Sequence, residues 1–452
     1  MHDSFISLRT IKRHELCYVN AIPTYLIKNY KIPGDKLIHI TLGADTVKIL
    51  PNSSKSAIYT FMSIPLKKMY KPLPIQVMPT TNGSSGPEIV HLSKYITAII
   101  EQNTRFVIDF IATDGDVGFD SCHRDFFVII EPILNLDIPF LEKIDKMASF
   151  VHIPVNDPLH LIKNGRSHIL NHPLMVDPET LRLVNMELFQ SATNLTKEIY
   201  DKSSIAAMKD FYALAIFSWQ SFYKLISHNR YDGAFYSLPF VYLIQCITST
   251  TLNRFERLSL LENAINFLMI QLKNVRKSDK NDFFTPIYHE KSIGTLFGSE
   301  IYIIRFINTL IALSIALIRM DEIAFSRIGS HAIECHFGLV RIFSHFNYTY
   351  ENSVSATIKT CLFKNVCDDL CYKYNVKKRI NEAGAFIDKS VLESESKNID
   401  FDLISNTIYM RLRGNKIPVE QAKRFNECIS LYNKLIEFTP SIRIQTEYSG
   451  TS

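Results

Sequence analysis

Hydrophobic and polar residues alternate with the period of β-strands in the first third of the chain. In residues 36–50, KLIHITLGADTVKIL, apolar side chains take the even positions from 38 to 44, whereas Asp45 falls on the other, more polar face. A repeat of two residues places successive side chains on opposite faces of a strand. The segment therefore predicts a strand that carries an aspartate on its polar face.

Further changes of period predict how this part of the chain continues. Short apolar runs that favour strands occupy residues 56–64, 73–80, 105–113 and 149–155. Apolar spacing typical of helices occupies residues 88–102, 122–134 and 157–170. In the last of these helices Asp157 stands at the N-cap and Pro158 at the first helical position. The predicted order is three strands, a helix, a strand, a helix, a strand and a helix.

From about residue 180 the pattern predicts helices only. Wide apolar faces with helical spacing recur in residues 208–226, 235–247, 257–276 and 300–320. A last amphipathic segment, SRIGSHAIECHFGLVRIF, places Ile333, Phe337 and Val340 on one stripe and Glu334 and Arg341 on an adjacent face.

These patterns divide the chain into five regions. They are a helical lead-in (1–35), an α/β core (36–175), an all-helical region (176–325), a helix that completes the core (326–350) and a helical C-terminal region with a mobile tail (351–452). The predicted fold class is thus α/β plus all-α.

Composition and charge narrow the class of protein only slightly. Hydrophobic residues make up 46% and charged residues 21% of the 452 residues, as in ordinary globular proteins. Fifty Lys and Arg against 45 Asp and Glu give a net charge of +5, which permits an anionic partner without requiring one. The eight cysteines form no CxxC pair, so we expect buried thiols in a reducing compartment.

Neither a secretory signal nor a membrane span is expected. The first residues, MHDSFISLRTIKRHELC, are polar where an apolar signal core would stand. The most apolar stretch, residues 301–320, is interrupted by Arg305 and Asn308, which favours a buried core helix. We therefore expect an intracellular protein with no membrane partner.

The segment IATDGDVGFD, residues 111–120, carries the strongest sign of chemistry. Its acids resemble the start of an EF-hand, but Phe119 occupies the sixth loop position, where that motif requires glycine. The run before it is a strand and not a helix, which also argues against a calcium loop. Asp114 is the best candidate for a functional acid, whereas Asp116 and Asp120 are expected in turn and helix-cap roles.

The predicted order of elements is that of an RNase H-like mixed sheet. In that fold an acid on the first strand and another at the end of the fourth face each other across a short gap, and a later helix supplies a third acid. Asp45 and Asp114 occupy the first two places. Carboxylates so arranged suit a pair of Mg²⁺ ions.

Four segments in the same order resemble the P-element-like DNA transposases, including the THAP-domain group. They are ITLGADTVKI (40–49), IATDGDVGFD (111–120), DPLHLIKNGRSHIL (157–170) and HAIECHFGLVRIF (331–343). The resemblance implies that the helical region 176–325 is a large insertion in the nuclease fold. It also implies that Asp45, Asp114 and Glu334 are the catalytic and metal-binding set.

The activity that this resemblance implies is cleavage and transfer of DNA strands with Mg²⁺ or Mn²⁺ in a nuclear or nucleo-cytoplasmic protein. DNA is the expected partner, with Lys163, Arg166 and Arg341 near the phosphates, and self-association is left open. The sequence departs from the family in two respects. It has no counterpart of the N-terminal zinc-binding DNA reader, and it has no GxxxxGK[ST] loop for a nucleotide.

Other interpretations of the same residues stay open at this point. The chain can be an inactive, transposase-derived protein that binds DNA or a protein, or a helical interaction protein with no link to nucleic acid. Glu334 can be a solvated residue paired with Arg341 or Arg327. Asp109, inside an apolar strand, is expected to be a paired core carboxylate. His160, Lys163 and Arg166 can bind phosphate or simply cover a polar helix face.

Overall fold

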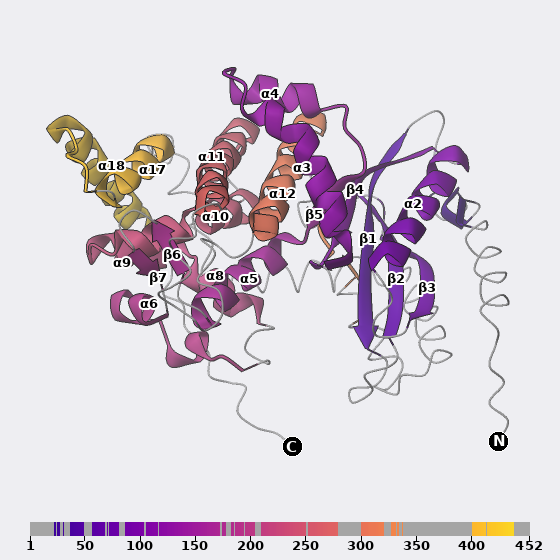
Figure 1. The fold of residues 1–452 in the computed structure, drawn as a ribbon, viewed down its shortest axis with the longest axis horizontal. Coiled ribbons are helices and arrows are strands. Elements are labelled where there is room, and N and C mark those ends of the chain that lie inside the picture. Colours follow the sequence, from indigo (N-terminus) through magenta and orange to yellow (C-terminus); the bar gives the residue numbers. More distant parts are fainter. Residues whose placement is uncertain are drawn as a thin grey trace. The chain divides into compact units, whose positions relative to one another are not determined.

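The protein is described by a computed structural model, shown in Figure 1. The residues that it describes are 22–23, 25–27, 30, 37–48, 57–67, 70, 72–80, 86–103, 105–115, 117–171, 174–177, 182–184, 186–193, 195–203, 209–249, 252–278, 300–320, 327–330, 332–333, 337, 400–412 and 414–437.

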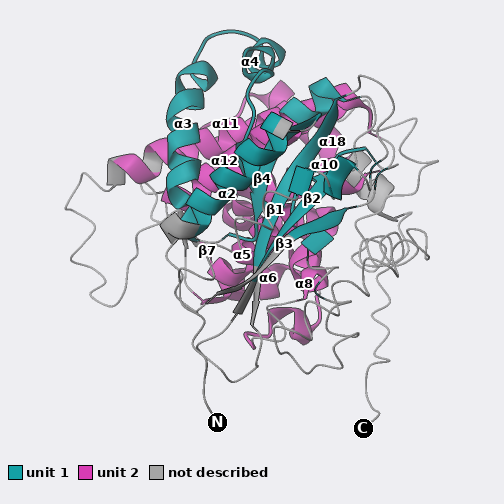
Figure 2. Ribbon diagram, turned by 90° about the vertical axis from the view of Figure 1, so that its right-hand side faces the viewer, with its two compact units in different colours: residues 1–157, 315–369 teal, residues 158–314, 370–452 magenta. Residues whose placement is uncertain are grey.

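The chain forms two compact units (Figure 2). Unit 1 contains residues 1–157 and 315–369, and unit 2 contains residues 158–314 and 370–452. The chain therefore leaves unit 1 after Asp157 and returns to it at Ile315. The segment 158–314 is thus inserted in unit 1, and it begins and ends earlier than the predicted region 176–325. The last 83 residues or so of the chain, predicted as part of a separate region, group with this insertion.

Unit 1 is built on a five-stranded mixed sheet with the order β3-β2-β1-β4-β5. Its strands are β1 (Ile38–Lys48), β2 (Ala57–Pro65), β3 (Leu73–Thr80), β4 (Phe106–Thr113) and β5 (Ile153–Asn156). The first three strands pair antiparallel, and β4 and β5 run parallel to β1. All five strands were predicted from the sequence, although β5 is shorter than its apolar run.

Helices fill the connections between these strands. They are α2 (Gly86–Asn103) between β3 and β4, and α3 (Asp120–Leu134) and α4 (Phe140–Met147) between β4 and β5, with the short 3-10 turn η1 (Val117–Phe119) before α3. The sequence predicted α2 and α3 but not α4. Parallel neighbours need such crossover connections, whereas antiparallel neighbours do not.

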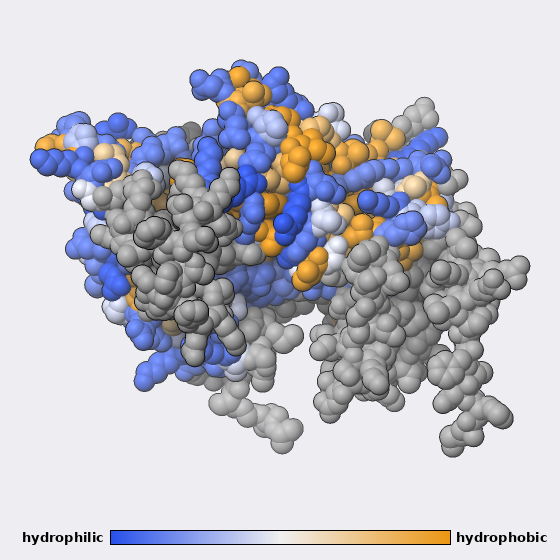
Figure 3. Space-filling model, in the orientation of Figure 1, coloured by the Kyte–Doolittle hydropathy of each residue, from blue (hydrophilic) through white to orange (hydrophobic). Residues whose placement is uncertain are grey.

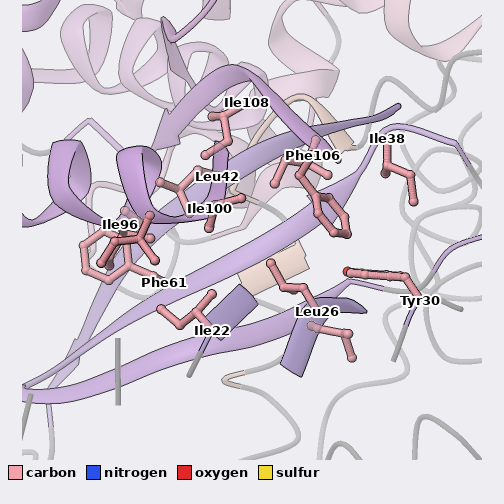
Figure 4. Close-up of a cluster of buried hydrophobic side chains, with 14 of the residues drawn as sticks. Ile22, Leu26, Tyr30, Ile38, Leu42, Phe61, Ile96, Ile100, Phe106 and Ile108 are labelled. Carbon is pink, nitrogen blue, oxygen red and sulfur yellow. The ribbon is translucent and has the colours of Figure 1, made fainter. Parts of the chain in front are cut away.

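The main core of unit 1 lies on one face of the sheet (Figure 4). The even-numbered side chains of β1 from Ile38 to Ala44 pack there with Ile96 and Ile100 of α2 and with Ile22 and Leu26 from the start of the chain. The alternation seen in the sequence therefore identified the buried face correctly.

Apolar side chains also reach the surface of unit 1. Figure 3 shows them gathered over α3 and α4, where Val128 is 69% exposed and Ile129 is 57% exposed, with Leu141 nearby in the chain at 44%. Scattered exposed apolar residues are normal, but several together on two consecutive helices are less common.

Unit 2 is mostly helical. The described elements of unit 2 are α5 (Pro158–Asn171), β6 (Leu174–Asp177), β7 (Arg182–Val184), α6 (Met186–Ala192), the 3-10 turn η2 (Lys197–Tyr200), α8 (Asp210–Ile216), α9 (Trp219–Ser227), α10 (Tyr231–Thr248), α11 (Arg254–Ser278), α12 (Glu300–Arg319), α17 (Phe401–Leu412) and α18 (Val419–Glu437). The end of α12, from Ile315, belongs to unit 1.

Two predictions for this region were wrong. It is not all-helical, because β6 and β7 form an antiparallel hairpin. The single helix expected over 208–226 is divided into α8 and α9, because Ser218 adopts an extended backbone and its side chain accepts a hydrogen bond from the Ser221 N–H. Serine is a preferred N-cap residue, and its hydroxyl starts α9 here.

Helix α10 lies at the centre of unit 2 and is buried on all sides. Its Tyr236 hydroxyl donates a hydrogen bond to the Gly165 carbonyl of α5, and its Tyr242 hydroxyl lies 2.6 Å from the Ser405 Oγ of α17. The first contact joins two helices of the inserted segment, and the second joins that segment to the C-terminal helix α17.

By length and composition alone, helix α12 is long and apolar enough to cross a membrane. The sequence had favoured a buried core helix instead, because Arg305 and Asn308 interrupt the apolar stretch. In the protein, however, 89% of its most apolar 18-residue window is buried. Burial of this extent is typical of a core helix.

We predict that Gly165→Ala destabilises unit 2. Alanine normally favours a helix interior over glycine by about 1 kcal/mol. Here an added Cβ would lie 2.4 Å from the Phe240 ring, so overpacking should dominate and lower the free energy of unfolding by roughly 1–3 kcal/mol. Thermal unfolding of Asn164→Ala, the preceding residue of the same helix, is the matched control and should show no loss.

Candidate functional site

Asp45 and Asp114 lie at the same level of two adjacent parallel strands. The pairing of β1 with β4 ends at Ala44 and Thr113; Asp45 is the next residue of β1, and Asp114 is the first residue after β4. Residues paired across a sheet project to the same face, so the register places both aspartates on the face opposite the main core. Asp45 is 7% exposed, whereas Asp114 is half-buried. The distance between the two carboxylates stays a prediction.

The backbone turns sharply directly after Asp114. Gly115 has a φ of 108°, a conformation that side chains with a Cβ rarely adopt. The glycine therefore lets the chain turn one residue after Asp114 and lead from β4 into η1 and α3. Asp120 is the first residue of α3, where a negative charge stabilises the helix dipole, and Asp116 lies outside the described residues.

The chain that returns to unit 1 packs on the same face of β1. The Ile333 side chain lies against Gly43, because a Cβ built on Gly43 would be 2.7 Å from the Ile333 Cδ1. Gly43 is two residues before Asp45 and projects to the same side of the strand. Ile333 is fully buried and Phe337 nearly so, as the predicted apolar stripe requires.

Two further contacts fasten this returning segment. The Arg327 guanidinium donates to the carbonyls of Pro65, Lys67 and Tyr70 in the connection between β2 and β3. The Ser330 hydroxyl donates to the Asp157 carboxylate at 3.4 Å. Residues 327–333 are therefore held against the sheet at several points before the chain reaches residue 334.

Asp157 is a buried acid that the sequence suggested only as a helix cap. It follows β5 directly, and its N–H donates to the Thr113 carbonyl at 2.9 Å, so it lies at the same edge of the sheet as Asp114. Its position immediately after a predicted strand was a signal that could have identified it. Among the described residues no group of three or more His, Cys, Asp or Glu side chains is placed to hold a metal ion.

Glu334 and Arg341 lie outside the described residues. Their assignment as third metal ligand and as phosphate contact therefore stays a prediction. The described carboxylates Asp45 and Asp114 supply oxygen ligands of the kind that Mg²⁺ prefers, but they do not make a complete site by themselves.

Asp109 is a paired core carboxylate, as predicted. Its side chain is buried within β4, and it accepts a hydrogen bond from Arg319 Nη1 at 2.7 Å. His39 Nδ1 of β1 lies 2.9 Å from its other oxygen. Arg319 also donates to the carbonyls of Ala148 and Phe150 before β5. The burial of this carboxylate is therefore compensated by a cation and by hydrogen bonds.

The two predicted phosphate contacts of α5 have partners within unit 2. Arg166 is 2% exposed and donates to the carbonyls of Ile199 and Asp201. Burial lowers the pKa of its guanidinium, although three hydrogen bonds to carbonyls keep its donors satisfied. This burial leaves no surface for a phosphate contact, so we assign Arg166 a structural role. Amphipathic spacing marked it as polar but could not reveal that η2 covers it.

Lys163 is less enclosed than Arg166 but is also paired. Its Nζ lies 3.1 Å from the Asp210 carboxylate and 3.3 Å from His160 Nε2. A phosphate would have to compete with Asp210 for this ammonium group, which weakens the case for Lys163 as a DNA contact.

The described cysteines are free thiols. Cys246 and Cys428 are buried and Cys122 is half-buried, and burial raises the pKa of the Cys246 thiol to about 12. A thiol with so high a pKa is a poor nucleophile at neutral pH. Cys361, Cys367 and Cys371 fall outside the described residues.

We predict that Gly43→Ala destabilises unit 1 by forcing apart Gly43 and Ile333. An alanine Cβ would also lie 2.9 Å from the Ile64 Cδ1, so we expect a loss of roughly 1–3 kcal/mol. Ile333→Ala alone should cost about 2–5 kcal/mol, because it leaves a cavity. The double variant should be more stable than the sum of the two losses implies. Strict additivity in urea unfolding would mean that Ile333 does not pack on Gly43.

Comparison with known proteins assigns the chain to no family. The chain matches no protein-family model, no curated protein and no solved structure. The candidate site therefore rests on the register of β1 and β4, on the path of residues 327–333 and on the chemistry of the acids.

Proposed function

We propose that unit 1 is an RNase H-like domain that catalyses transfer of DNA phosphodiesters in the manner of a transposase. The observation that carries the proposal is the position of Asp45 and Asp114 at one level of two adjacent parallel strands in a sheet of order β3-β2-β1-β4-β5. The finer assignment to P-element-like transposases rests on the four sequence segments alone.

In this proposal the carboxylates of Asp45 and Asp114 are the first two metal ligands, and the carboxylate of Glu334 is the third. Ile333, the residue before Glu334, packs against Gly43, two residues before Asp45, which supports a short path from Glu334 to the two aspartates. Bound Mg²⁺ or Mn²⁺ would activate a water molecule, and then the 3′-hydroxyl of a DNA end, for attack on the scissile phosphate and would stabilise the charge that develops there. The protein's own contribution is to fix the carboxylates at one edge of a rigid sheet.

DNA is the proposed partner, and the proposed location is nuclear or nucleo-cytoplasmic. The residues that contact the phosphates are not those of α5, because Arg166 is buried and Lys163 is paired with Asp210. Arg341 is the predicted contact that stays in the proposal.

The second candidate is an inactive, transposase-derived protein that binds DNA or protein. What favours it is that the two α5 cations predicted to contact phosphates are engaged within unit 2, Arg166 with the Ile199 and Asp201 carbonyls and Lys163 with Asp210. Measurement of Mn²⁺ binding distinguishes the candidates, because an inactive descendant has no need to retain the ions.

We predict that Asp45→Asn and Asp114→Asn each abolish Mg²⁺-dependent cleavage of DNA. An amide is a much poorer ligand than a carboxylate for a hard cation, so the rate should fall by roughly 10³-fold or more. Asp125→Asn is the matched control, because this exposed residue of α3 belongs to no proposed site and should leave the rate unchanged. Equal rates for all three variants and the parent protein would contradict the proposal.

Glu334→Gln tests the third ligand. We expect the variant to fold and to bind DNA as the parent does, yet to lose cleavage and strand joining. If the parent protein cuts DNA and the Gln variant cuts it equally well, Glu334 is not a metal ligand and the resemblance in residues 331–343 is misleading.

We predict that DNA binding depends on salt and only weakly on sequence. Contacts to phosphates release counterions, so the logarithm of the affinity should fall by about 0.9 for each contact per tenfold rise in salt. Arg341→Gln should reduce this slope, whereas Arg166→Lys should mainly reduce thermal stability. An affinity that is equal at low and high salt would argue against DNA as the partner.

A further inference from the structure

Strand β4 contains one residue more than β1 can pair with, and this residue is Asp109. Ile40 pairs with Ile108, but the next residue of β1, Thr41, pairs with Phe110. Asp109 therefore forms a bulge in the parallel pairing. Bulges locally disrupt the hydrogen bonding of a sheet and shift which side chains face which side.

The bulge determines the face on which the end of β4 places its side chains. Before the bulge Phe106 and Ile108 pack in the main core, and after it Ile111 packs against that core. Strict alternation from Ile108 would have sent Phe110 to the core and Ile111 away from it. Without the bulge Asp114 would align with Thr46 of β1, on the core face. With the bulge, Asp114 aligns with Asp45.

Electrostatic contacts hold the bulge in place from both sides. The Asp109 carboxylate, 1% exposed, accepts from Arg319 of α12 at 2.7 Å and lies 2.9 Å from His39 Nδ1. The neighbouring Ile108 N–H donates to Glu101 Oε1 of α2 at 3.0 Å, and the Ile108 carbonyl accepts from the His152 N–H. The backbone N–H and carbonyl of Ile108, the residue before the bulge, are therefore bonded to α2 and to the residue that precedes β5.

We propose that Asp109, clamped by Arg319, is a positioning residue that places Asp114 on the face of Asp45. Its importance for catalysis rests on the proposed function, whereas its effect on the register does not. A buried carboxylate without its cation is costly, so the pair favours the one register in which Asp109 points towards Arg319. Slippage by one residue would turn Asp114 to the opposite face of the sheet.

The alignment is testable by chemical cross-linking. In the parent protein the pair Asp45→Cys/Asp114→Cys should be linked by the short thiol reagent dibromobimane, whereas Asp45→Cys/Thr113→Cys should react weakly, since position 113 faces the core. Mass spectrometry of the linked peptides separates these products from any that involve native cysteines. More linkage at 45–113 than at 45–114 would overturn the proposal.

Two matched double variants then isolate the bulge. The first, Asp109→Asn/Arg319→Met, keeps the extra residue but removes the clamp, so linkage at 45–114 should fall several-fold and linkage at 45–113 should rise. The second combines deletion of Asp109 with Arg319→Met. It removes the clamp and the extra residue together, and every other pair between β1 and β4 can form as before. Its linkage at 45–114 should match that of the parent.

An ordinary structural ion pair would give a different result. Both double variants would then lose stability to a similar extent and keep the parent's pattern of links, and this outcome overturns the proposal. Loss of the 45–114 link in the deletion variant, with the sheet still folded by circular dichroism, also overturns it. If either double variant fails to fold, Asp109→Asn alone replaces the pair, and an unchanged ratio of the two links is then the contradicting result.

Binding of Mn²⁺ separates this proposal from the proposed function. Electron paramagnetic resonance on protein without added cysteines, with Asp45→Asn as control, reports whether the aspartates bind the ion. If the links behave as expected but the parent binds no Mn²⁺, the metal site is wrong while Asp109 still sets the register. If Mn²⁺ binds and Asp109→Asn/Arg319→Met weakens it at least tenfold, both proposals are supported.

Discussion

A carboxylate buried in the middle of a β-sheet requires a cation beside it, and the contact between Asp109 and Arg319 meets this requirement in unit 1. The contact joins β4 to the end of α12, and through His39 it also reaches the start of β1. Because Arg319 in addition holds the carbonyls of Ala148 and Phe150, one guanidinium fixes the entry to β5 and the point where the chain returns from the insertion. The register of the parallel strands and the path of the returning chain thus share one anchor.

The sheet of unit 1 is covered on both faces around β1, although the sequence of β1 suggests one polar face. Thr41 and Gly43 are buried there, and the returning residues Ile333 and Arg327 account for part of this cover. Parallel strands are generally found buried on both sides, and β1 is parallel to β4. Asp114 therefore lies at the margin of this packed structure, directly after β4, whereas Asp45 lies within β1 and is 7% exposed.

The local pattern of hydrophobic and polar residues predicted most strands and helices of unit 1. It predicted few of the contacts between residues that are far apart in the sequence. Alternation identified β1 and its core face, and an aspartate inside an apolar run was enough to predict that Asp109 is paired. Its partner could not be predicted, because Arg319 lies 210 residues away in the sequence, at the end of a mostly apolar helix. The bulge could not be predicted either, since it appears only when β4 is aligned with β1. The burial of Arg166 follows from the path of η2, and no helical periodicity contains that information.

The discontinuity of unit 1 has a consequence for how the protein is made. The ribosome adds Asp109 to the chain long before it adds Arg319. At a synthesis rate of about 5–20 residues per second, the separation of 210 residues corresponds to a delay on the order of 10 s or longer. During this time the nascent sheet carries an acidic side chain in its interior with no arginine to neutralise it. We expect the growing chain to leave the end of β4 open to water during this time. Until α12 emerges, we therefore expect the N-terminal segment to depend on chaperones, and we expect a truncated product that ends before residue 319 to aggregate or to be degraded.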